Sequence, residues 1–334
     1  MTKLFEGFKG NRFGVFGRVG MDLFATPVGT KSTHADSFDA DIGGSAANIC
    51  VGLEKLGSRA ALITSVSDDA VGRFCTRRLA GYGVDVSLVR AVAGECRTSL
   101  AVYESSMDDF QNVIYRNNAA DFQVTEADMA AVDYTAYTAI ISAGTVFAAE
   151  PSRSATFKVF EDARAAGLPI IFDIDYRPYS WPSAEVAADV LSRASTYCDM
   201  IVGNDEEFGF MAGGYGKGLE MARELGAKDC LTIYKMGEGG ALTFTGGTEI
   251  STGIYPVTAV KPNGAGDSFM SGLLASLAGG LPLKDAVLRG SACASIVVSK
   301  PGCAPAMPTM QELETFLASH PGPTAGPVGS TIAD

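Results

Sequence analysis

The sequence is poor in the residues on which several common protein functions depend. It holds two histidines, and its seven cysteines show neither a CxxC pair nor the Cys/His spacing of a zinc site. Lys and Arg number 26 against 38 Asp and Glu, a formal net charge of −12, and no basic cluster occurs. This balance argues against nucleic acid or an acidic membrane surface as a partner, because both require a positive face.

Long apolar segments are missing as well. No run of 18 apolar residues occurs, and residues 1–10 lack the apolar core of a signal peptide. The cysteines lie mostly in apolar surroundings, which is typical of reduced thiols inside a cytoplasmic protein. With 47% hydrophobic and 19% charged residues, the chain is expected to be a globular cytoplasmic protein.

Two familiar nucleotide-binding patterns are also absent. The P-loop pattern GxxxxGK[ST] does not occur. Gly14, Gly17 and Gly20 lack the GxGxxG spacing, and no helix follows them directly, which disfavours a dinucleotide-binding dehydrogenase. A phosphate site in this chain must therefore be built in another way.

What the sequence does contain is a regular alternation of apolar strand-length and helix-length segments. Strands are predicted at 13–17, 60–66, 139–142, 170–174, 200–202, 230–234 and 241–245, and helices at 45–56, 68–82, 152–166, 184–194, 205 onward, 217–225, 267–278 and 283–299. Near-continuous apolar strands between helices indicate a parallel sheet covered on both faces. The predicted fold class is therefore α/β, with three layers α/β/α and a mostly parallel central sheet.

Two further predicted strands, 97–103 and 112–116, interrupt this alternation. Together with the polar residues 23–42 they predict a small β-sheet that stands off the main domain as a lid. We assign residues 1–22, 43–95 and 120–320 to the core and residues 23–42 and 96–119 to the lid. The Pro- and Gly-rich residues 321–334 are expected to be a disordered tail. A second copy could cover the open edges of the lid, so a homodimer through the lid is expected.

A glycine-rich turn precedes the predicted helix at 267–278. Because Gly264, Ala265 and Gly266 are small, their backbone N–H groups can converge on one point, where the helix dipole also favours an anion. If that anion were the only ligand of the site, the neighbouring carboxylate of Asp267 would repel it. The pattern fits a site in which the backbone N–H groups bind a phosphoryl group. That group would then be transferred to a neutral hydroxyl that lies beside the carboxylate of Asp267. The alternative is a core helix with an aspartate in its first turn.

A second glycine pair opens the predicted helix near the N-terminus. Gly43 and Gly44 let a ligand approach the backbone, Ser45 is the expected N-cap, and Asn48 offers a donor and an acceptor one turn later. Asp22 ends an early strand, where its carboxylate could accept hydrogen bonds from sugar hydroxyls. A solvated turn aspartate fits that residue equally well.

Polar residues follow three of the predicted strands. Ligands of such folds bind at the carboxyl ends of parallel strands, which makes these residues a candidate site. They are Asp173, Asp175, Arg177, Asn204, Glu207, Lys235 and Gly237.

These motifs resemble the signatures of the ribokinase-like (PfkB) carbohydrate kinases. Residues 43–48 (GGSAAN) are similar to the first signature, residues 264–267 (GAGD) to the second, and residues 204–207 (NDEE) to the family's Asn-x-x-Glu motif. Residues 17–22 (GRVGMD), 150–154 (EPSRS) and 173–181 (DIDYRPYSW) narrow the likeness to the kinases of 5-dehydro-2-deoxy-D-gluconate.

The resemblance implies a ribokinase-like fold and an ATP- and Mg²⁺-dependent kinase. Its implied substrate is a sugar acid, 5-dehydro-2-deoxy-D-gluconate of myo-inositol catabolism, phosphorylated on the terminal C6 hydroxyl. A 2-keto-3-deoxygluconate kinase, another sugar kinase such as a fructokinase or ribokinase, and a non-catalytic sugar or nucleotide sensor remain alternatives.

The resemblance also implies roles for individual residues. Asp267 would be the catalytic base, and Gly264, Ala265 and Gly266 would form the anion hole. The implied substrate-binding residues are Asp22, Gly43, Gly44, Asn48, Arg116 and Arg177, the two arginines facing the carboxylate. The residues implied for ATP and Mg²⁺ are Asn204, Glu207, Lys235 and Gly237, with no direct protein ligand and the metal held through water near Glu207.

The sequence departs from the family pattern just before its second signature. Many members have Asp-Thr-x-Gly-Ala-Gly-Asp, and here Lys261, Pro262 and Asn263 precede the Gly-Ala-Gly. The missing Asp and Thr belong to a monovalent-cation site in such enzymes, so activation by K⁺ is left open. Lys261 either supplies a fixed positive charge instead or is simply exposed.

Overall fold

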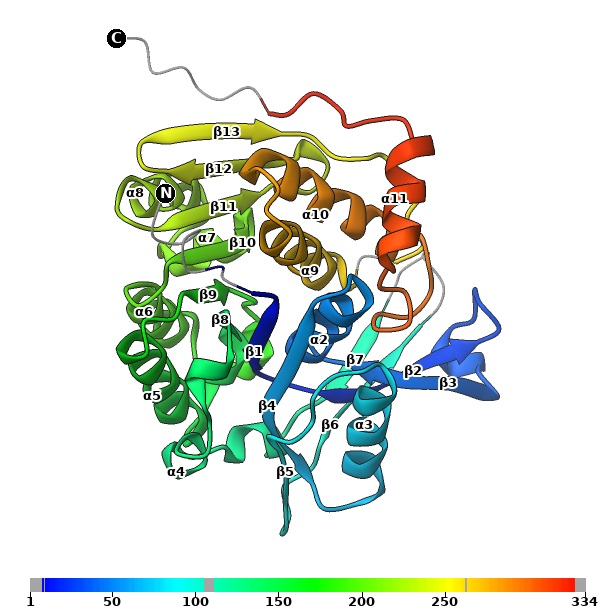
Figure 1. Cartoon of the computed structure of the whole chain (residues 1–334). Helices are drawn as coiled ribbons and strands as arrows, with labels where there is room; N and C mark the ends of the chain where they lie inside the picture. The colour runs from blue at the N-terminus through cyan, green and yellow to red at the C-terminus, as the bar shows by residue number, and fades with distance from the viewer. Residues whose placement is uncertain (1–7, 9, 105–110, 262, 328–334) are drawn as a thin grey trace.

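The computed structural model describes residues 8, 10–104, 111–261 and 263–327, and its largest feature is a nine-stranded sheet. The strand order is β13-β12-β11-β10-β9-β8-β1-β4-β5 (Figure 1). Seven neighbouring strands, from β11 to β5, run parallel, and β12 and β13 are antiparallel at one edge. The bounds are β1 Arg12–Phe16, β4 Arg59–Ser67, β5 Val89–Val92, β8 Ala139–Ala143, β9 Ile170–Asp173, β10 Met200–Asn204, β11 Leu231–Lys235, β12 Ala241–Thr245 and β13 Thr248–Thr252.

Helices cover both faces of this sheet (Figure 1). One face carries α2 Ser45–Lys55, α3 Ala70–Gly81, α9 Ala265–Ala278, α10 Leu283–Val298 and, outside them, α11 Met310–Ser319. The other carries α4 Glu126–Met129, α5 Ser152–Ala165, α6 Ala184–Ser195, α7 Asp205–Met211 and α8 Gly218–Ala227. The predicted three-layer α/β/α fold with a mostly parallel sheet is confirmed.

The strands show why both faces need a helical layer. In β10, Met200 and Val202 pack into the core that holds α2, α9 and α10, while Ile201 between them packs into the core that holds α5 and α6. Since neighbouring side chains of a strand point to opposite faces, an uninterrupted apolar strand fills two cores at once. All seven cysteines are free and buried, as expected for core residues.

A second, four-stranded sheet, called the small sheet here, has the order β3-β2-β6-β7. Its strands are β2 Gly20–Thr26, β3 Ser37–Gly43, β6 Ser99–Tyr103 and β7 Asn112–Tyr115. β2 and β6 are parallel, and the other two pairs are antiparallel. β2 begins at Gly20, so residues 20–22, which the sequence assigned to the core, already pair with the small sheet.

The two faces of the small sheet differ in character. On the face called inner here, Asp22 lies opposite Ala101, and Phe24 stacks on Tyr103 with ring centroids 5.1 Å apart. Asp22, Ser99 and Tyr103 on this face are buried. The outer face is apolar and partly exposed, and its members include Leu23, Phe38, Leu100, Val102, Val113 and Tyr115.

Several elements were not predicted from the sequence: β5, β13, α4 and α11. Short or polar strands such as Val89–Val92 and Thr248–Thr252 carry too little apolar alternation to be recognised. The chain end differs from expectation only in part. The N–H of Thr324 donates to the carbonyl of Ile254, and the Ser251 hydroxyl donates to the carbonyl of Pro327, so residues 321–327 run beside β13. The predicted disorder of residues 328–334 lies outside the described residues.

Within the described part of the chain, every helix is too short or too polar to cross a bilayer.

Candidate active site

The candidate site is centred on the N-terminus of α9. Gly264 is the N-cap, with φ of +83°, a left-handed conformation that glycine adopts without strain. The first N–H groups of a helix have no partner within it, so those at Gly264, Ala265 and Gly266 are available to a ligand. Asp267 lies in the same first turn and is partly buried. The structure therefore places an anion-binding backbone and a carboxylate side by side, as the sequence predicted.

Helix α2 holds Asp267 in place. The Asn48 side-chain amide donates to Oδ2 of Asp267 over 2.7 Å. The Ser271 hydroxyl lies 2.8 Å from the carbonyl oxygen of Asp267 and 3.2 Å from that of Ile49, and so ties α9 to α2. One detail differs from the prediction. The N-cap of α2 is Gly44, with φ of +98°, whereas Ser45 is the first helical residue and its hydroxyl makes no capping bond.

The environment of Asp267 prepares it to accept a proton. Burial raises the pKa of Asp267 to about 6, and the negative charge of Asp175 acts in the same direction. The hydrogen bond from Asn48 and the positive charges of Arg177 and Lys235 act against this rise. A carboxylate with this pKa is ionised at neutral pH and is a stronger base than an exposed aspartate.

Asp22 approaches the same region from the inner face of the small sheet. Its side chain is 2% exposed, and burial raises its pKa to about 7, with Arg18 lowering it and Asp267 raising it further. An ideal Cβ on Gly43 would lie 1.9 Å from Oδ2 of Asp22, so only glycine leaves room for that carboxylate. The two predicted sugar-binding motifs are thereby brought together.

These two pKa values predict that kcat/KM falls on the acid side of its pH profile. A carboxyl group accepts a proton or a hydroxyl hydrogen bond only when it is ionised, so function is lost as the pH falls through each pKa. With ATP and Mg²⁺ saturating, we expect kcat/KM for the sugar to be level near pH 8 and to fall below pH 7 as Asp22 titrates. The fall should steepen below pH 6 as Asp267 follows. Initial rates between pH 5 and 9 measure it, and a level profile down to pH 5 would contradict these assignments.

Lys235 lies at the end of β11, on the other side of the anion-binding turn. Its Nζ is 3.4 Å from the position that a Cβ on Gly266 would occupy, and 5.5 Å from the ring centroid of Phe269. Within the described residues its ammonium forms no ion pair with a carboxylate. The charge is therefore available to a phosphate at the N-terminus of α9.

Acidic residues lie behind the site at the ends of β9 and β10. Asp175 has φ of +37°, unusual for a residue with a side chain, and its Oδ1 lies 2.7 Å from Nη2 of Arg177. Nη1 of Arg177 lies 3.6 Å from Oε1 of Glu207. Burial, only partly offset by Lys235, holds the pKa of Asp173 well above its usual range. The left-handed backbone of Asp175 just after β9 is strained, and backbone strain of this kind is typical of functional sites.

The remaining residues predicted to bind ATP and Mg²⁺ either bond each other or lie exposed. Asn204 and Glu207 form a capping box at the start of α7, in which each side chain accepts the other residue's backbone N–H over 2.8 Å. Gly237 is exposed in the short turn between β11 and β12. Their predicted contacts with ATP and Mg²⁺ stay predictions.

Arg116 is buried at the end of β7 and is already paired. Its Nη2 lies 2.5 Å from Oδ2 of Asp121, both side chains being at most 4% exposed, and its Nη1 donates to the Ser180 hydroxyl over 3.1 Å. The Phe122 ring lies under the guanidinium, 4.3 Å away. The sequence predicted Arg116 for a substrate carboxylate, and the structure gives it a carboxylate of the chain.

Known proteins of similar sequence show which family the chain belongs to. The profile of the pfkB family of carbohydrate kinases matches residues 12–310. The chain belongs to the pfkB family of carbohydrate kinases. It is 36% identical over 313 residues to a 5-dehydro-2-deoxygluconokinase of Geobacillus kaustophilus, covering 91% of this chain and 92% of that one. A 5-dehydro-2-deoxygluconokinase of Photobacterium profundum is 35% identical over 92% of this chain and 94% of its own.

Solved structures agree. An aminoimidazole riboside kinase from Salmonella enterica, complexed with aminoimidazole riboside and an ATP analog, has a TM-score of 0.78 at 25% identity, covering 92% of this chain and 100% of its own. A PfkB protein from Polaromonas has a TM-score of 0.78 at 26% identity, covering 91% and 99%. The predicted resemblance is confirmed, and the chain is an ATP-dependent sugar kinase.

The structure also brings to the site residues that the sequence analysis did not assign. Arg18 and Tyr103 lie beside Asp22, and Asp121 pairs with Arg116. Residues 17–22 carried the family likeness, but a basic residue between two strands gives no sign of which way it points. Asp121 follows Arg116 by five residues, and only the turn between them makes the pair.

Lys261 is buried in the kinase rather than exposed. It is 5% exposed, and its Nζ donates to the carbonyl of Asn263 over 2.5 Å, within the segment that leads into Gly264. Burial lowers the pKa of Lys261, while Cys303, Asp267 and Asp22 act to raise it. Of the two alternatives for Lys261, the structure therefore supports the fixed positive charge.

This position predicts a kinase that does not depend on K⁺. The ammonium already places one positive charge beside the anion-binding turn, where a bound cation would otherwise act. We expect kcat to stay within about twofold when K⁺ is replaced by Na⁺ or choline at constant ionic strength. Steady-state rates in the three chloride salts test this, and a severalfold gain with K⁺ alone would contradict it.

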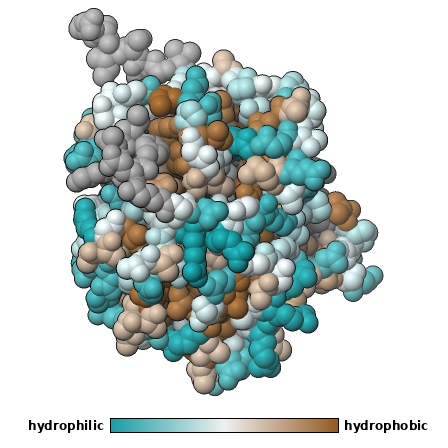
Figure 2. Space-filling model, viewed as in Figure 1, coloured by the Kyte–Doolittle hydropathy of each residue, from teal (hydrophilic) through white to brown (hydrophobic). Residues whose placement is uncertain are grey.

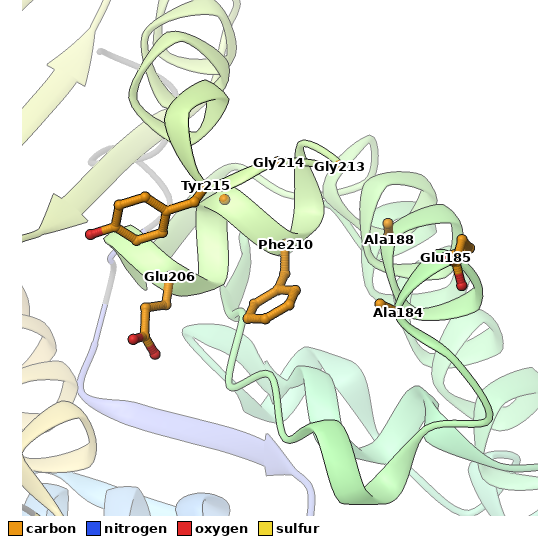
Figure 3. A pocket seen from close by; sticks show the side chains of 9 residues that line it. Ala184, Glu185, Ala188, Glu206, Phe210, Gly213, Gly214 and Tyr215 are labelled. Atoms are coloured by element: carbon orange, nitrogen blue, oxygen red, sulfur yellow. The ribbon is translucent and has the colours of Figure 1, made fainter.

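A separate hollow of about 310 Å³ lies between α6 and α7 (Figure 3). In Figure 3, Phe210 lies between Ala184 and Ala188 of α6 on one side and Glu206 and Tyr215 on the other. None of the site residues predicted from the sequence lines it, so the kinase reaction is assigned to the N-terminus of α9 and not to this hollow.

Proposed function

We propose that the kinase transfers the γ-phosphoryl group of ATP to the C6 hydroxyl of 5-dehydro-2-deoxy-D-gluconate. Relatives at 33–36% identity over about nine-tenths of this chain bear the name of that activity. The structural observation that carries the proposal is Arg18, which lies beside Asp22 and forms no ion pair with a described carboxylate, whereas Arg116 and Arg177 are paired within the chain. A neutral sugar does not require an unpaired arginine in its site.

In the proposed reaction, Asp267 accepts the proton of the C6 hydroxyl. The hydroxyl oxygen then forms a bond to the γ-phosphorus while the bond from that phosphorus to the bridging oxygen breaks, and ADP leaves. Negative charge on the transferred group is stabilised by the N–H groups of Gly264, Ala265 and Gly266 and by the ammonium of Lys235. Asn48 keeps the carboxylate of Asp267 aimed at the hydroxyl through its 2.7 Å hydrogen bond.

The acidic residues at the strand ends fit a Mg²⁺ ion held through water. Glu207 uses Oε2 to accept the N–H of Asn204 and turns Oε1 toward Arg177, so it has little capacity left for a direct metal bond. Mg²⁺ keeps several waters and binds through phosphates and one or two carboxylates. Bound with ATP, it would neutralise phosphate charge, and Glu207 and Asp173 would hold its waters.

The small sheet would shield the reaction from water, the competing phosphoryl acceptor. Its inner face carries Asp22 and Tyr103 toward the site, and water exclusion also strengthens the electrostatic interactions within it. We retain the predicted division into core and lid on this basis. We also infer a cytoplasmic location, where ATP is available and seven free cysteines stay reduced.

The deciding experiment is ADP release measured with a panel of acceptors. Wild-type kinase is assayed with 5-dehydro-2-deoxygluconate, 2-keto-3-deoxygluconate, fructose and ribose at several concentrations. We expect the highest kcat/KM with 5-dehydro-2-deoxygluconate. A preference for 2-keto-3-deoxygluconate would select the second candidate acid, and a preference for fructose or ribose would overturn the sugar-acid proposal but not the kinase assignment.

We propose, in addition, that two copies pair through the outer face of the small sheet. Val28, Phe38, Val113 and Tyr115 are 71%, 39%, 51% and 60% exposed, a concentration of exposed apolar residues on one small element. Hydrophobic atoms protrude at its far end, at the right of Figure 2. Exposed apolar faces of this kind mark association surfaces.

The dimer has a direct test. Light scattering at micromolar concentration is expected to give twice the chain mass for the wild type. Val113→Asp should shift the mass toward the monomer, because it places a charge in the interface. Leu281→Asp, a matched change at a residue 38% exposed between α9 and α10, should leave the dimer intact. A monomeric wild type would refute pairing.

A further inference from the structure

Arg18 differs from the other two arginines of the site. It lies between β1 and β2, and its Nη1 donates to the Ser99 hydroxyl over 3.1 Å. Its Nε, like that of Arg116, is buried and has no hydrogen-bond partner, so what distinguishes Arg18 is the lack of a paired carboxylate. Among the described residues, no carboxylate forms an ion pair with Arg18. A guanidinium cannot lose its charge by deprotonation, so Arg18 is a partly buried cation without a paired anion, on which Asp121 and Asp22 act only from beyond ion-pair distance.

The arginines predicted for the substrate carboxylate are compensated within the chain. Arg116 is held by Asp121 at 2.5 Å, and both side chains are almost fully buried. Arg177 is 46% exposed and pairs with Asp175 at 2.7 Å, with Glu207 at 3.6 Å. A substrate carboxylate would have to compete with these pairs, whereas at Arg18 it would find an unpaired charge.

The position of Arg18 fits one end of an extended sugar acid. Its Nη1 is 3.5 Å from the place of a Cβ on Gly20, and Gly20 and Asp22 are on the same face of β2, about 7 Å apart along the strand. The charges of Arg18 and Asp267 both act on the pKa of Asp22, since Arg18 lowers it and Asp267 raises it. Arg18, Asp22 and Asp267 thus follow one another from the small sheet to the anion-binding turn.

We propose that Arg18 binds the carboxylate of the sugar acid and thereby selects acids over neutral sugars. This rests on the proposed function, in which C6 reacts at Asp267. The carboxylate is C1, at the opposite end of the six-carbon chain, and the groups between them lie beside Asp22. A guanidinium offers two parallel donors to a carboxylate, and the free Nε is one of those that can take part.

The test compares the acid with its C1 carboxamide in wild type and Arg18→Gln. Wild type should prefer the acid. Arg18→Gln should raise KM for the acid about 10- to 100-fold, the effect expected when a charged hydrogen-bond partner is lost. Its kcat/KM for the carboxamide should stay within about threefold of wild type, because glutamine pairs with an amide. Ser99→Ala is the matched control, since it removes the hydroxyl partner and keeps the guanidinium, and it should retain the preference for the acid.

The outcomes separate this inference from the proposed function. If wild type phosphorylates the acid and Arg18→Gln lowers activity on acid and carboxamide equally, Arg18 only supports the structure and the inference is wrong. If Arg18→Gln fails to fold, as judged by circular dichroism, Arg18→Lys takes its place and should still raise KM for the acid alone. If wild type uses 2-keto-3-deoxygluconate instead, the proposed substrate is wrong and Arg18 is tested with that acid and its amide. Use of neutral sugars alone overturns both.

Discussion

Asp267→Asn is expected to lower kcat by at least about 100-fold, because general base catalysis contributes roughly 10²–10⁴-fold. The change keeps the size of the side chain and removes its capacity to accept a proton. The KM for ATP should change little, since the backbone N–H groups of Gly264, Ala265 and Gly266 remain. Steady-state kinetics with ATP and the sugar acid measure both parameters.

The control is Asp189→Asn, the same substitution at an exposed residue of α6, which should leave kcat unchanged. A direct binding measurement with ATP shows whether the site is intact in Asp267→Asn. Near-normal turnover in that variant would remove Asp267 from the mechanism, whereas lost ATP binding would indicate a structural role at the start of α9.

Lys235→Met is expected to lower kcat by about 10²–10³-fold, the range observed when one group that stabilises developing negative charge is removed. Methionine has nearly the shape of lysine and keeps the packing beside Phe269, but carries no charge. The Nζ of Lys235 lies 3.4 Å from the position that a Cβ on Gly266 would occupy, so it can reach a phosphoryl group bound at the N-terminus of α9. The KM for the sugar acid should hardly change, because Asp22 and Arg18, proposed to contact the acid, lie at the small sheet, whereas Lys235 ends β11.

Two variants make this result specific. Lys217→Met repeats the substitution at an exposed lysine before α8 and should have no effect. Lys235→Arg keeps a positive charge and should retain more activity than Lys235→Met. If both changes at position 235 only raise KM for ATP, Lys235 contributes to ground-state binding and not to the transfer step.

Much of this site could be predicted from the sequence because its central motifs are contiguous in the chain. Gly264 to Asp267 are contiguous, and a glycine-rich turn before an apolar helix has one chemical meaning wherever the helix packs. The strand-end residues were predictable for a similar reason, since parallel strands bring their carboxyl ends to one edge. Helix α11 also has a local signal, since Thr309 and Glu312 form its capping box.

What the sequence could not supply is which charges neutralise one another. Arg177 and Asp175 are two residues apart, yet their pairing depends on the left-handed backbone of Asp175. Lys261 is buried because its backbone N–H, with that of Val260, reaches the carbonyl of Val298 at the end of α10. Such contacts depend on tertiary packing, and a charged residue beside a motif does not reveal whether its partner is a substrate or a neighbour.

The hydroxyl of Ser271, shared between the carbonyls of Asp267 and Ile49, links helix α9 to helix α2. The proposed base Asp267 and the Asn48 amide that bonds it therefore lie on two helices that are tied together. Arg18's partner Ser99 and the carboxylate of Asp22 belong instead to the small sheet. With the small sheet as the proposed lid, substrate entry and product release would need movement of that sheet alone, and Asn48 and Asp267 would stay together between turnovers.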